Sequence, residues 1–492
     1  MSAMTQSLTG AAFNQKSDWS AINWLHVDKQ VWRMQMRIAK AIREKRYGKA
    51  KALQRLLACS IHGKLTAVKH VTGNSGSKTP GVDGVTWKTP RQKMNAVFDL
   101  KRKGYKTQPL RRIYIPKRNG QKRPLSIPTM KCRAMQALHL LGLEPIAETI
   151  ADPNSYGFRP KRSAADAIEH CFNALAKKQS AQWVLEGDIK SCFDKINHDW
   201  LLANVPMDKE ILRKWLKAGY VEDGTLHQTN EGTPQGGVIS PCLLTITLSG
   251  LQALLKEHWP WHCGKVNIVV YADDFIVTGK SKELLENEVR PLIQSFLNER
   301  GLQLSIEKSK VTNIDDGFDF LGFNVRKYKG KLLTKPSPGR VKDFLANIKS
   351  EIKRMRNGKT ENLIHQLNPK IRGWSNYYRH VVAKETFAKV DHIIFEALWR
   401  WSMRRHPKKG RRWVKKKYFR SNRNNNWVFF AKAIDKQDGP YFLDLIFASK
   451  TPIRRHVKTK SDANPYDPKY RDYFYERESR KRKTGSDCSP VL

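Results

Sequence analysis

The sequence predicts an α+β protein in which an antiparallel sheet is followed by helices. Two apolar runs, residues 267–270 (NIVV) and 275–277 (FIV), are β-branched and aromatic, which is typical of strands joined by a tight turn. A third strand is predicted at 183–189 (WVLEGDI). Beyond residue 336, apolar side chains recur every three or four positions with Lys and Arg between them, which indicates amphipathic helices.

Length and charge narrow the class of protein. At 492 residues the chain is too long for one ordinary domain, and its 40% apolar content is sufficient for buried cores. The formal net charge of +46 favours a polyanionic partner, and nucleic acid is the natural one. A membrane surface would also attract cations, but here the charge is spread along the chain and no apolar run approaches the length of a span. We therefore expect no membrane partner.

The first 180 residues divide into two predicted units. Residues 1–71 are expected to form a basic helical region, with a loose leader up to about residue 17 followed by two amphipathic helices. The Gly- and Ser-containing stretch 74–80 (NSGSKTP) is a loop that begins a second unit, residues 72–180. The apolar strands then fall in a third unit, residues 181–335.

Three acidic residues form the candidate catalytic site. Asp273 and Asp274 lie at the tip of the predicted hairpin, and Asp188 ends the predicted strand before it. Each has an ordinary alternative, since acids are common in surface turns and Asp often caps a helix. Together they fit the carboxylate set that holds two Mg²⁺ ions for phosphoryl transfer. Neighbouring strand residues point in opposite directions, so Asp273 is expected to be a direct ligand and Asp274 need not be one.

The C-terminal part is predicted to be helical and then strongly basic. Residues 336–405 form the helical unit, residues 406–477 a basic unit, and residues 478–492 a disordered tail. The basic unit contains a run in which cations alternate with aromatics, which suits contacts with phosphates and bases, although most charge runs are only solvated surface. Its candidate nucleic-acid-binding residues are Lys408, Lys409, Arg411, Arg412, Trp413, Lys415, Lys416 and Lys417.

Several blocks along the chain resemble, in the same order, those of group II intron-encoded reverse transcriptases, which combine a polymerase with an RNA-splicing maturase. The resemblance implies a right-hand polymerase with an N-terminal extension and fingers (72–180), a palm (181–335), a thumb or maturase domain (336–405) and a DNA-binding domain (406–477). The matching blocks are 79–84 (TPGVDG), 112–117 (RIYIPK), 123–129 (RPLSIPT), 155–160 (SYGFRP), 233–241 (TPQGGVISP), 304–310 (LSIEKSK) and 318–323 (FDFLGF).

The resemblance also implies a role for individual residues. With the carbonyl of Ile189, the three acids would hold two Mg²⁺ ions. Residues expected to contact the incoming deoxynucleotide are Lys117, Arg123, Phe193 and Gln235, and those expected to support primer and template are Lys308, Leu321 and Gly322. The first two could instead be solvated hairpin charges, and Phe193, expected to exclude a 2′-hydroxyl, could simply cap the core.

A thumb signature at 371–378 (IRGWSNYY) includes three residues that could contact RNA. These are Arg372, Trp374 and Tyr377, and a helix packed in the thumb core is the equally weighted alternative.

The family implies several partners, namely group II intron RNA, target DNA with a primer strand, and deoxynucleoside triphosphates, in a bacterial cytosol and on the nucleoid. Alternatives are a domesticated reverse transcriptase of phage defence or DNA repair and a non-enzymatic splicing factor, although the intact acids argue against the latter. Residues 464–470 (NPYDPKY) resemble the segment that leads into the family's metal-dependent endonuclease, which is expected to be missing here by nature or by truncation. The oligomeric state is left open.

Overall fold

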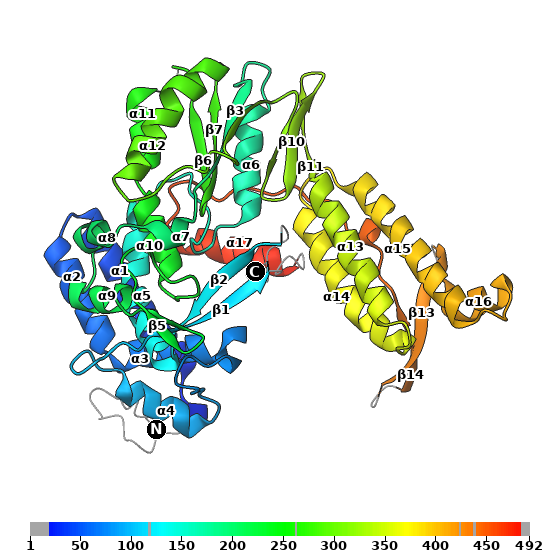
Figure 1. The fold of residues 1–492 in the computed structure, drawn as a ribbon, viewed down its shortest axis with the longest axis horizontal. Coiled ribbons are helices and arrows are strands. Elements are labelled where there is room, and N and C mark those ends of the chain that lie inside the picture. Colours follow the sequence, from blue (N-terminus) through cyan, green and yellow to red (C-terminus); the bar gives the residue numbers. More distant parts are fainter. Residues whose placement is uncertain (1–18, 117–119, 261–262, 423–424, 436–438, 484–492) are drawn as a thin grey trace, which may run out of the picture.

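The computed structural model describes residues 19–116, 120–260, 263–422, 425–435 and 439–483. It confirms the α+β class, with helices and largely antiparallel sheets. In Figure 1 the N-terminal helices and the sheet that carries the candidate acids lie on one side of the molecule, and three long helices lie on the other. The C-terminal helix α17 (Arg471–Lys483) lies between these two parts.

The N-terminal region contains three α-helices before residue 73, so the expected pair of helices is wrong. Ser60 is the reason for the additional break, because its side chain accepts a hydrogen bond from the Gly63 N–H and caps a new helix. The helices of this region are α1 (Trp24–Arg43), α2 (Tyr47–Cys59), α3 (Ile61–Thr72) and α4 (Pro90–Asp99). The first three of them pack against α5 (Met130–Ile150), and α4 packs against α3. The expected leader up to about residue 17 lies outside the described residues.

The three predicted palm strands and a fourth that was not predicted, β8, form an antiparallel sheet in the order β6–β7–β3–β8. These strands are β3 (Trp183–Asp188), β6 (Asn267–Tyr271), β7 (Asp274–Gly279) and β8 (Lys310–Asn313). Neighbouring residues point to opposite faces, so Leu185 and Phe275 join one core while Val184 and Ile276 join another. Helix α6 (Ala164–Leu175) packs beside β6. The sheet is therefore held between two cores, which fixes the strand ends that bear the acids.

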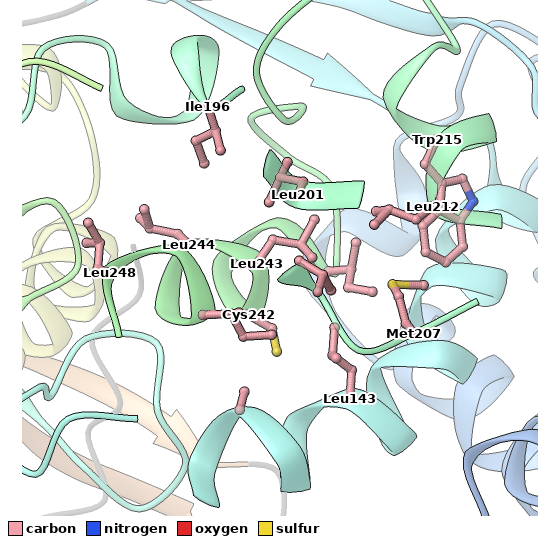
Figure 2. Close-up of a cluster of buried hydrophobic side chains, with 14 of the residues drawn as sticks. Leu143, Ile196, Leu201, Met207, Leu212, Trp215, Cys242, Leu243, Leu244 and Leu248 are labelled. Atoms are coloured by element: carbon pink, nitrogen blue, oxygen red, sulfur yellow. The ribbon is translucent and has the colours of Figure 1, made fainter. Parts of the chain in front are cut away.

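A second sheet, in the order β2–β1–β4–β5, forms the predicted fingers hairpin and its base. Its strands are β1 (Leu110–Pro116), β2 (Lys122–Ile127), β4 (Tyr220–Glu222) and β5 (Thr225–His227). Behind it, side chains from α5, α8 (His198–Asn204), α9 (Lys209–Leu216) and α10 (Ser240–Leu248) meet in an apolar core, part of which is shown in Figure 2.

The predicted thumb consists of three helices that share a core around Ile348, Phe387 and Leu398. They are α13 (Pro338–Arg354), α14 (Thr360–Tyr378) and α15 (Lys384–Arg405). A small sheet connects them to the palm, with strands β9 (Phe318–Phe320), β10 (Phe323–Tyr328) and β11 (Lys331–Pro336). After the thumb come helix α16 (Arg411–Tyr418) and strands β12 (Phe419–Asn422), β13 (Asn425–Asp435) and β14 (Gly439–Asp444).

The last described segment corrects the expectation of a disordered tail. Residues 478–483 belong to α17, and Glu478 in this helix forms an ion pair with Lys161. Residues 484–492, the rest of the expected tail, lie outside the described residues. Within the described part of the chain, every helix is too short or too polar to cross a bilayer. The boundaries of the six predicted units stay predictions.

A buried ion pair fixes the turn at residues 155–160. The Arg159 guanidinium donates two hydrogen bonds of 2.7 Å to the Glu148 carboxylate, and the two side chains are only 3% and 1% exposed. It also donates to the carbonyl oxygens of Asp152 and Ser155. The Arg162 Nε lies 3.6 Å from the same carboxylate. One buried carboxylate thus balances two buried guanidinium groups.

We expect Glu148→Ala to lower the free energy of unfolding by about 3–5 kcal/mol, because it removes the carboxylate that both buried guanidinium groups contact. Chemical denaturation would measure the change. Glu299→Ala is the matched control, since Glu299 pairs with Arg300 from a side chain that is 68% exposed and should cost about 0–1 kcal/mol. Equally small losses in both variants would contradict the buried-pair account.

Candidate active site

The β3–β7 pairing brings two of the candidate acids together. Asp188 is the last residue of β3, Asp274 is the first of β7, and the two are directly opposite in the antiparallel register. Asp273 lies in the turn between β6 and β7, which is tight enough to hold Ala272 at φ +57°. One residue away, Gly187 faces Phe275, and a Cβ on Gly187 would lie 2.2 Å from the Phe275 ring. Glycine is therefore required there for the two strands to pair.

The electrostatics of the three acids show an excess of negative charge. Burial, together with the charge of Asp188, raises the pKa of Asp273. Burial raises the pKa of Asp274 to about 6, and the charges of Asp273 and Asp188 add to the effect. The side chain is surrounded by protein on most sides, but it is open to solvent where it faces the cavity. Lys308 partly offsets this repulsion, because its ammonium group donates a 2.9 Å hydrogen bond to the Asp188 carboxylate. That bond raises the pKa of Lys308.

The donor set suits hard divalent cations, which prefer carboxylate oxygens. Two carboxyl groups with raised pKa values next to a third are the arrangement that a bound cation would stabilise. Among the described residues, however, no three acidic, His or Cys side chains are placed closely enough to coordinate one ion as they stand.

A cavity of about 2060 Å³ opens in front of the acids and contains most of the residues predicted for the site. Besides the acids, it is lined by Arg123, Ile189, Phe193, Gln235, Lys308 and Leu321. Gly322 lies behind Leu321, and its carbonyl oxygen accepts a hydrogen bond from the Tyr378 hydroxyl. Lys117 lies outside the described residues.

The loop that carries Gln235 is joined to the fingers hairpin. The Ser126 N–H, on β2, donates a 2.7 Å hydrogen bond to the Gln235 carbonyl oxygen. Gly236 has φ +110°, and a Cβ at that position would lie 2.9 Å from the Ser126 carbonyl oxygen, which explains the glycine. The Gln235 side chain in turn donates a 2.9 Å hydrogen bond to Asp194.

Sequence reasoning missed Phe158, although it lies in one of the quoted blocks. Its side chain is 42% exposed, its backbone is left-handed at φ +57°, and its ring contacts Phe193 edge-on at 6.0 Å. The neighbouring Gly157 touches the hairpin turn, since a Cβ there would lie 2.2 Å from the Ala272 nitrogen. An exposed aromatic between a glycine and a buried arginine was the available signal. Phe158 and Phe193 both line the cavity.

Two of the three candidate residues in the thumb signature make contacts within the protein, and the third is exposed. Trp374 stacks on Phe344 at 4.6 Å within the thumb, which favours the packing alternative for this residue. The Tyr377 hydroxyl donates a 2.8 Å hydrogen bond to the Leu321 carbonyl oxygen, so this residue supports the cavity wall. Arg372 is exposed. RNA contact by these residues stays a prediction.

The basic run at 408–417 lies on and before α16, away from the cavity lining. Trp413 is 38% exposed, and the ammonium groups of Lys409 and Lys417 lie 5.7 and 4.8 Å from its ring centroid. Lys415 lies over the Trp427 ring at 4.3 Å. The other cations of the run, Lys408, Arg411, Arg412 and Lys416, are exposed. The surface has the composition of a nucleic-acid-binding face, and that role stays a prediction.

Three family models match successive parts of the chain. They describe the N-terminal domain of reverse transcriptase (residues 19–100), the reverse transcriptase or RNA-dependent DNA polymerase itself (115–325), and the group II intron maturase-specific domain (341–419). The matched segments together include the sheet with the acids and the helices of the thumb.

Curated relatives agree with this assignment. Protein YkfC of Escherichia coli is 33% identical over 311 residues, which cover 54% of this chain and 80% of the relative. The group II intron-encoded protein LtrA of Lactococcus lactis is 29% identical over 373 residues, which cover 62% of this chain and 60% of the relative. Among solved structures, telomerase from Candida tropicalis aligns over 61% of this chain and 63% of its own, at 14% identity and a TM-score of 0.39, too distant to bear on the assignment. The chain belongs to the family of group II intron-encoded reverse transcriptases and maturases.

Proposed function

We propose that this protein copies RNA into DNA and also binds its own group II intron RNA to promote splicing, so that the intron can spread by target-primed reverse transcription. The observation that supports the polymerase most directly is the pairing of Asp188 with Asp274 beside Asp273, at the wall of a large basic cavity. The maturase-specific segment at 341–419 supports the RNA partner.

The three carboxylates would hold two Mg²⁺ ions, with the Ile189 carbonyl as a further ligand. Bound Mg²⁺ would lower the pKa of the primer 3′-hydroxyl and stabilise the departing pyrophosphate. Lys308, which neutralises Asp188 in the structure, would then be released toward the pyrophosphate or the primer strand. Leu321, held by the Tyr377 hydroxyl, would support the primer end.

The incoming deoxynucleotide would be held from several sides of the cavity. Arg123, together with Lys117, would clamp the triphosphate, since a guanidinium group binds phosphate oxygens in a bidentate manner. Gln235 would lie beside the nucleotide, oriented by its hydrogen bond to Asp194. Phe193 would stack under the sugar and exclude a 2′-hydroxyl, and its contact with Phe158 would keep its ring in place.

Two other functions use the same fold. A non-enzymatic splicing factor would not need the acids, whose repulsion is unfavourable unless a cation is bound. A reverse transcriptase recruited to phage defence or DNA repair would keep the acids but would not need intron RNA. Splicing assays with intron RNA from the flanking genome would separate the second case from our proposal.

We expect Asp273→Asn to reduce DNA synthesis about a thousandfold, because loss of a metal ligand removes several kcal/mol of transition-state stabilisation. Primer extension on an RNA template with Mg²⁺ and four deoxynucleotides, with and without intron RNA, measures the effect. RNA affinity should change less than about twofold. Asp316→Asn, in an exposed turn, is the control and should keep full activity. Undiminished synthesis by the Asp273 variant would refute the proposal.

We expect Phe193→Val to lower discrimination against ribonucleotides by about 10- to 100-fold, because the smaller side chain leaves room for a 2′-hydroxyl. The readout is the ratio of kcat/KM for a deoxynucleotide to that for the matching ribonucleotide. Phe395→Val removes a half-buried ring in α15 that does not line the cavity, and should leave the ratio unchanged. If the Phe193 variant behaves in the same way, the gate role is excluded.

The raised pKa of Asp274 predicts a pH-dependent change in stability. The folded-state pKa of about 6 lies above the ordinary value of 3.8 for an aspartate, so the folded protein loses stability as the pH rises from about 4 to 6. Without metal at pH 7.5, Asp274→Asn should therefore be more stable than the unmodified protein by about 1 kcal/mol. The difference is no larger because solvent screens the charge of the exposed carboxyl group. Below pH 4 the difference should vanish. Denaturation at both pH values, with and without Mg²⁺, measures it, and equal stabilities at pH 7.5 would contradict the account.

A further inference from the structure

The segment after β14 does not extend away from the polymerase. Residues 448–483, here called the C-terminal strap, run from the thumb back to the fingers and palm. The strap ends in α17, which lies between the thumb helices and the rest of the molecule (Figure 1). The strap includes residues 464–470, which resemble the segment that precedes the endonuclease domain in other members of the family. Its contacts show that it is built into the polymerase.

The beginning of the strap is held by the thumb. The Asp391 carboxylate, on α15, accepts hydrogen bonds from the backbone N–H groups of Ala448 and Ser449, at 2.7 and 2.9 Å. Lys384, on the same helix, donates to the carbonyl oxygens of Ser449 and Thr451. Further on, the Arg454 N–H donates a 2.8 Å hydrogen bond to the carbonyl oxygen of Arg379, just after α14.

The middle of the strap is held by Asp166, a carboxylate on α6 that is fully buried. One of its oxygens lies 2.9 Å from His456 Nε2, and accepts hydrogen bonds from the N–H and hydroxyl groups of Thr459 and from the guanidinium of Arg477. Its other oxygen accepts from Ser163. Three strap residues thus depend on one carboxylate of the fingers, and burying that charge is favourable only with such partners.

The far end of the strap reaches the N-terminal helices. The Tyr466 hydroxyl donates a hydrogen bond to Glu144 on α5, and Arg43 on α1 forms an ion pair with Asp467. Arg162 donates to the carbonyl oxygens of Ser461 and Ala463. The strap is therefore a second connection between thumb and fingers, in addition to the chain that passes through the palm.

One face of the strap forms part of the wall of the active-site cavity. In α17, residues 473, 476, 477 and 480 line the cavity, a spacing that places them on a single helix face. They are Tyr473, Glu476, Arg477 and Arg480, and upstream Arg454 and Arg455 line the same cavity. The last two are exposed and form no ion pair with any residue that the structure describes. Cations thus outnumber anions on this wall.

We propose that the C-terminal strap is a clamp that contacts the phosphate backbone of the primer–template duplex as it leaves the active site, through Arg454, Arg455 and Arg480. This inference rests on the proposed polymerase function and adds the surface that retains its nucleic acid. The three guanidinium groups face the cavity that contains the acids, and guanidinium groups bind phosphates without reading sequence.

The charge of this wall favours a clamp over a plug. A helix that kept nucleic acid out of the cavity would present mainly acidic or apolar side chains to it, whereas this wall presents four arginines and a single carboxylate. That carboxylate, Glu476, lies 3.4 Å from the Arg480 guanidinium in an exposed ion pair that a phosphate can replace. The wall is also fixed from both sides, by Asp391 of the thumb and Asp166 of the fingers, so little ordering is required when the duplex binds.

The test is the salt dependence of binding to an RNA–DNA primer–template duplex without metal, measured by fluorescence anisotropy. The full chain is compared with the triple variant Arg454→Gln, Arg455→Gln, Arg480→Gln. The matched control is Arg33→Gln, Arg55→Gln, Arg91→Gln, which removes three exposed arginines that do not line the cavity. Since each phosphate contact contributes about 0.9 to the slope of log affinity against log salt, the strap variant should have a slope about 2–3 units shallower.

Processivity gives a second readout, with an excess of unlabelled duplex as a trap. The strap variant should release the duplex severalfold earlier, while its first nucleotide addition at saturating duplex stays within about twofold of the unmodified protein. If the strap variant has the same salt slope and the same product length as the control variant, the clamp proposal is wrong. Tighter duplex binding by the strap variant would also overturn it, because the strap would then exclude nucleic acid from the cavity. If the unmodified protein binds the duplex but adds no nucleotide, the polymerase proposal fails while the slope still decides the clamp.

Discussion

The register between β3 and β7 is the constraint on which the rest of the site depends. It places Asp188 directly opposite Asp274, next to Asp273, so that three like charges meet at the end of a buried sheet. Repulsion of this kind would open an isolated hairpin, but here each strand is fixed by residues that enter two separate cores. Packing thus holds the carboxylates close together despite their mutual repulsion, which is typical of sites that bind cations.

The surroundings of the acids reinforce this position from behind. The turn at 155–160 touches the acidic hairpin through Gly157, and the buried Arg159–Glu148 pair prevents that turn from moving away. The same turn presents Phe158 to the cavity beside Phe193. A contact deep in the fingers therefore controls both the shape of the acidic turn and the position of the two rings.

The sequence was sufficient where local patterns and motifs determine structure. The β-branched and aromatic runs and the acidic turn predicted β3, β6 and β7 with the acids at their ends, and apolar residues at every third or fourth position predicted the thumb helices. It failed at Ser60, where a helix cap was overlooked, and at α17, whose charged composition resembles a disordered tail. The contacts of Asp166 with His456 and Arg477 span about 300 residues, and no local pattern reports pairings of that kind.

The 2.7 Å hydrogen bond from Ser126 to the Gln235 carbonyl has a mechanical consequence. This hydrogen bond joins two backbone groups without a flexible side chain between them, so a displacement of one segment moves the other. If the β1–β2 hairpin tilts inward over a triphosphate, the glutamine loop must travel with it, because Gly236 leaves no gap to absorb the shift. Closure of the hairpin over the triphosphate and the approach of Gln235 to the nucleotide would then be one movement instead of two.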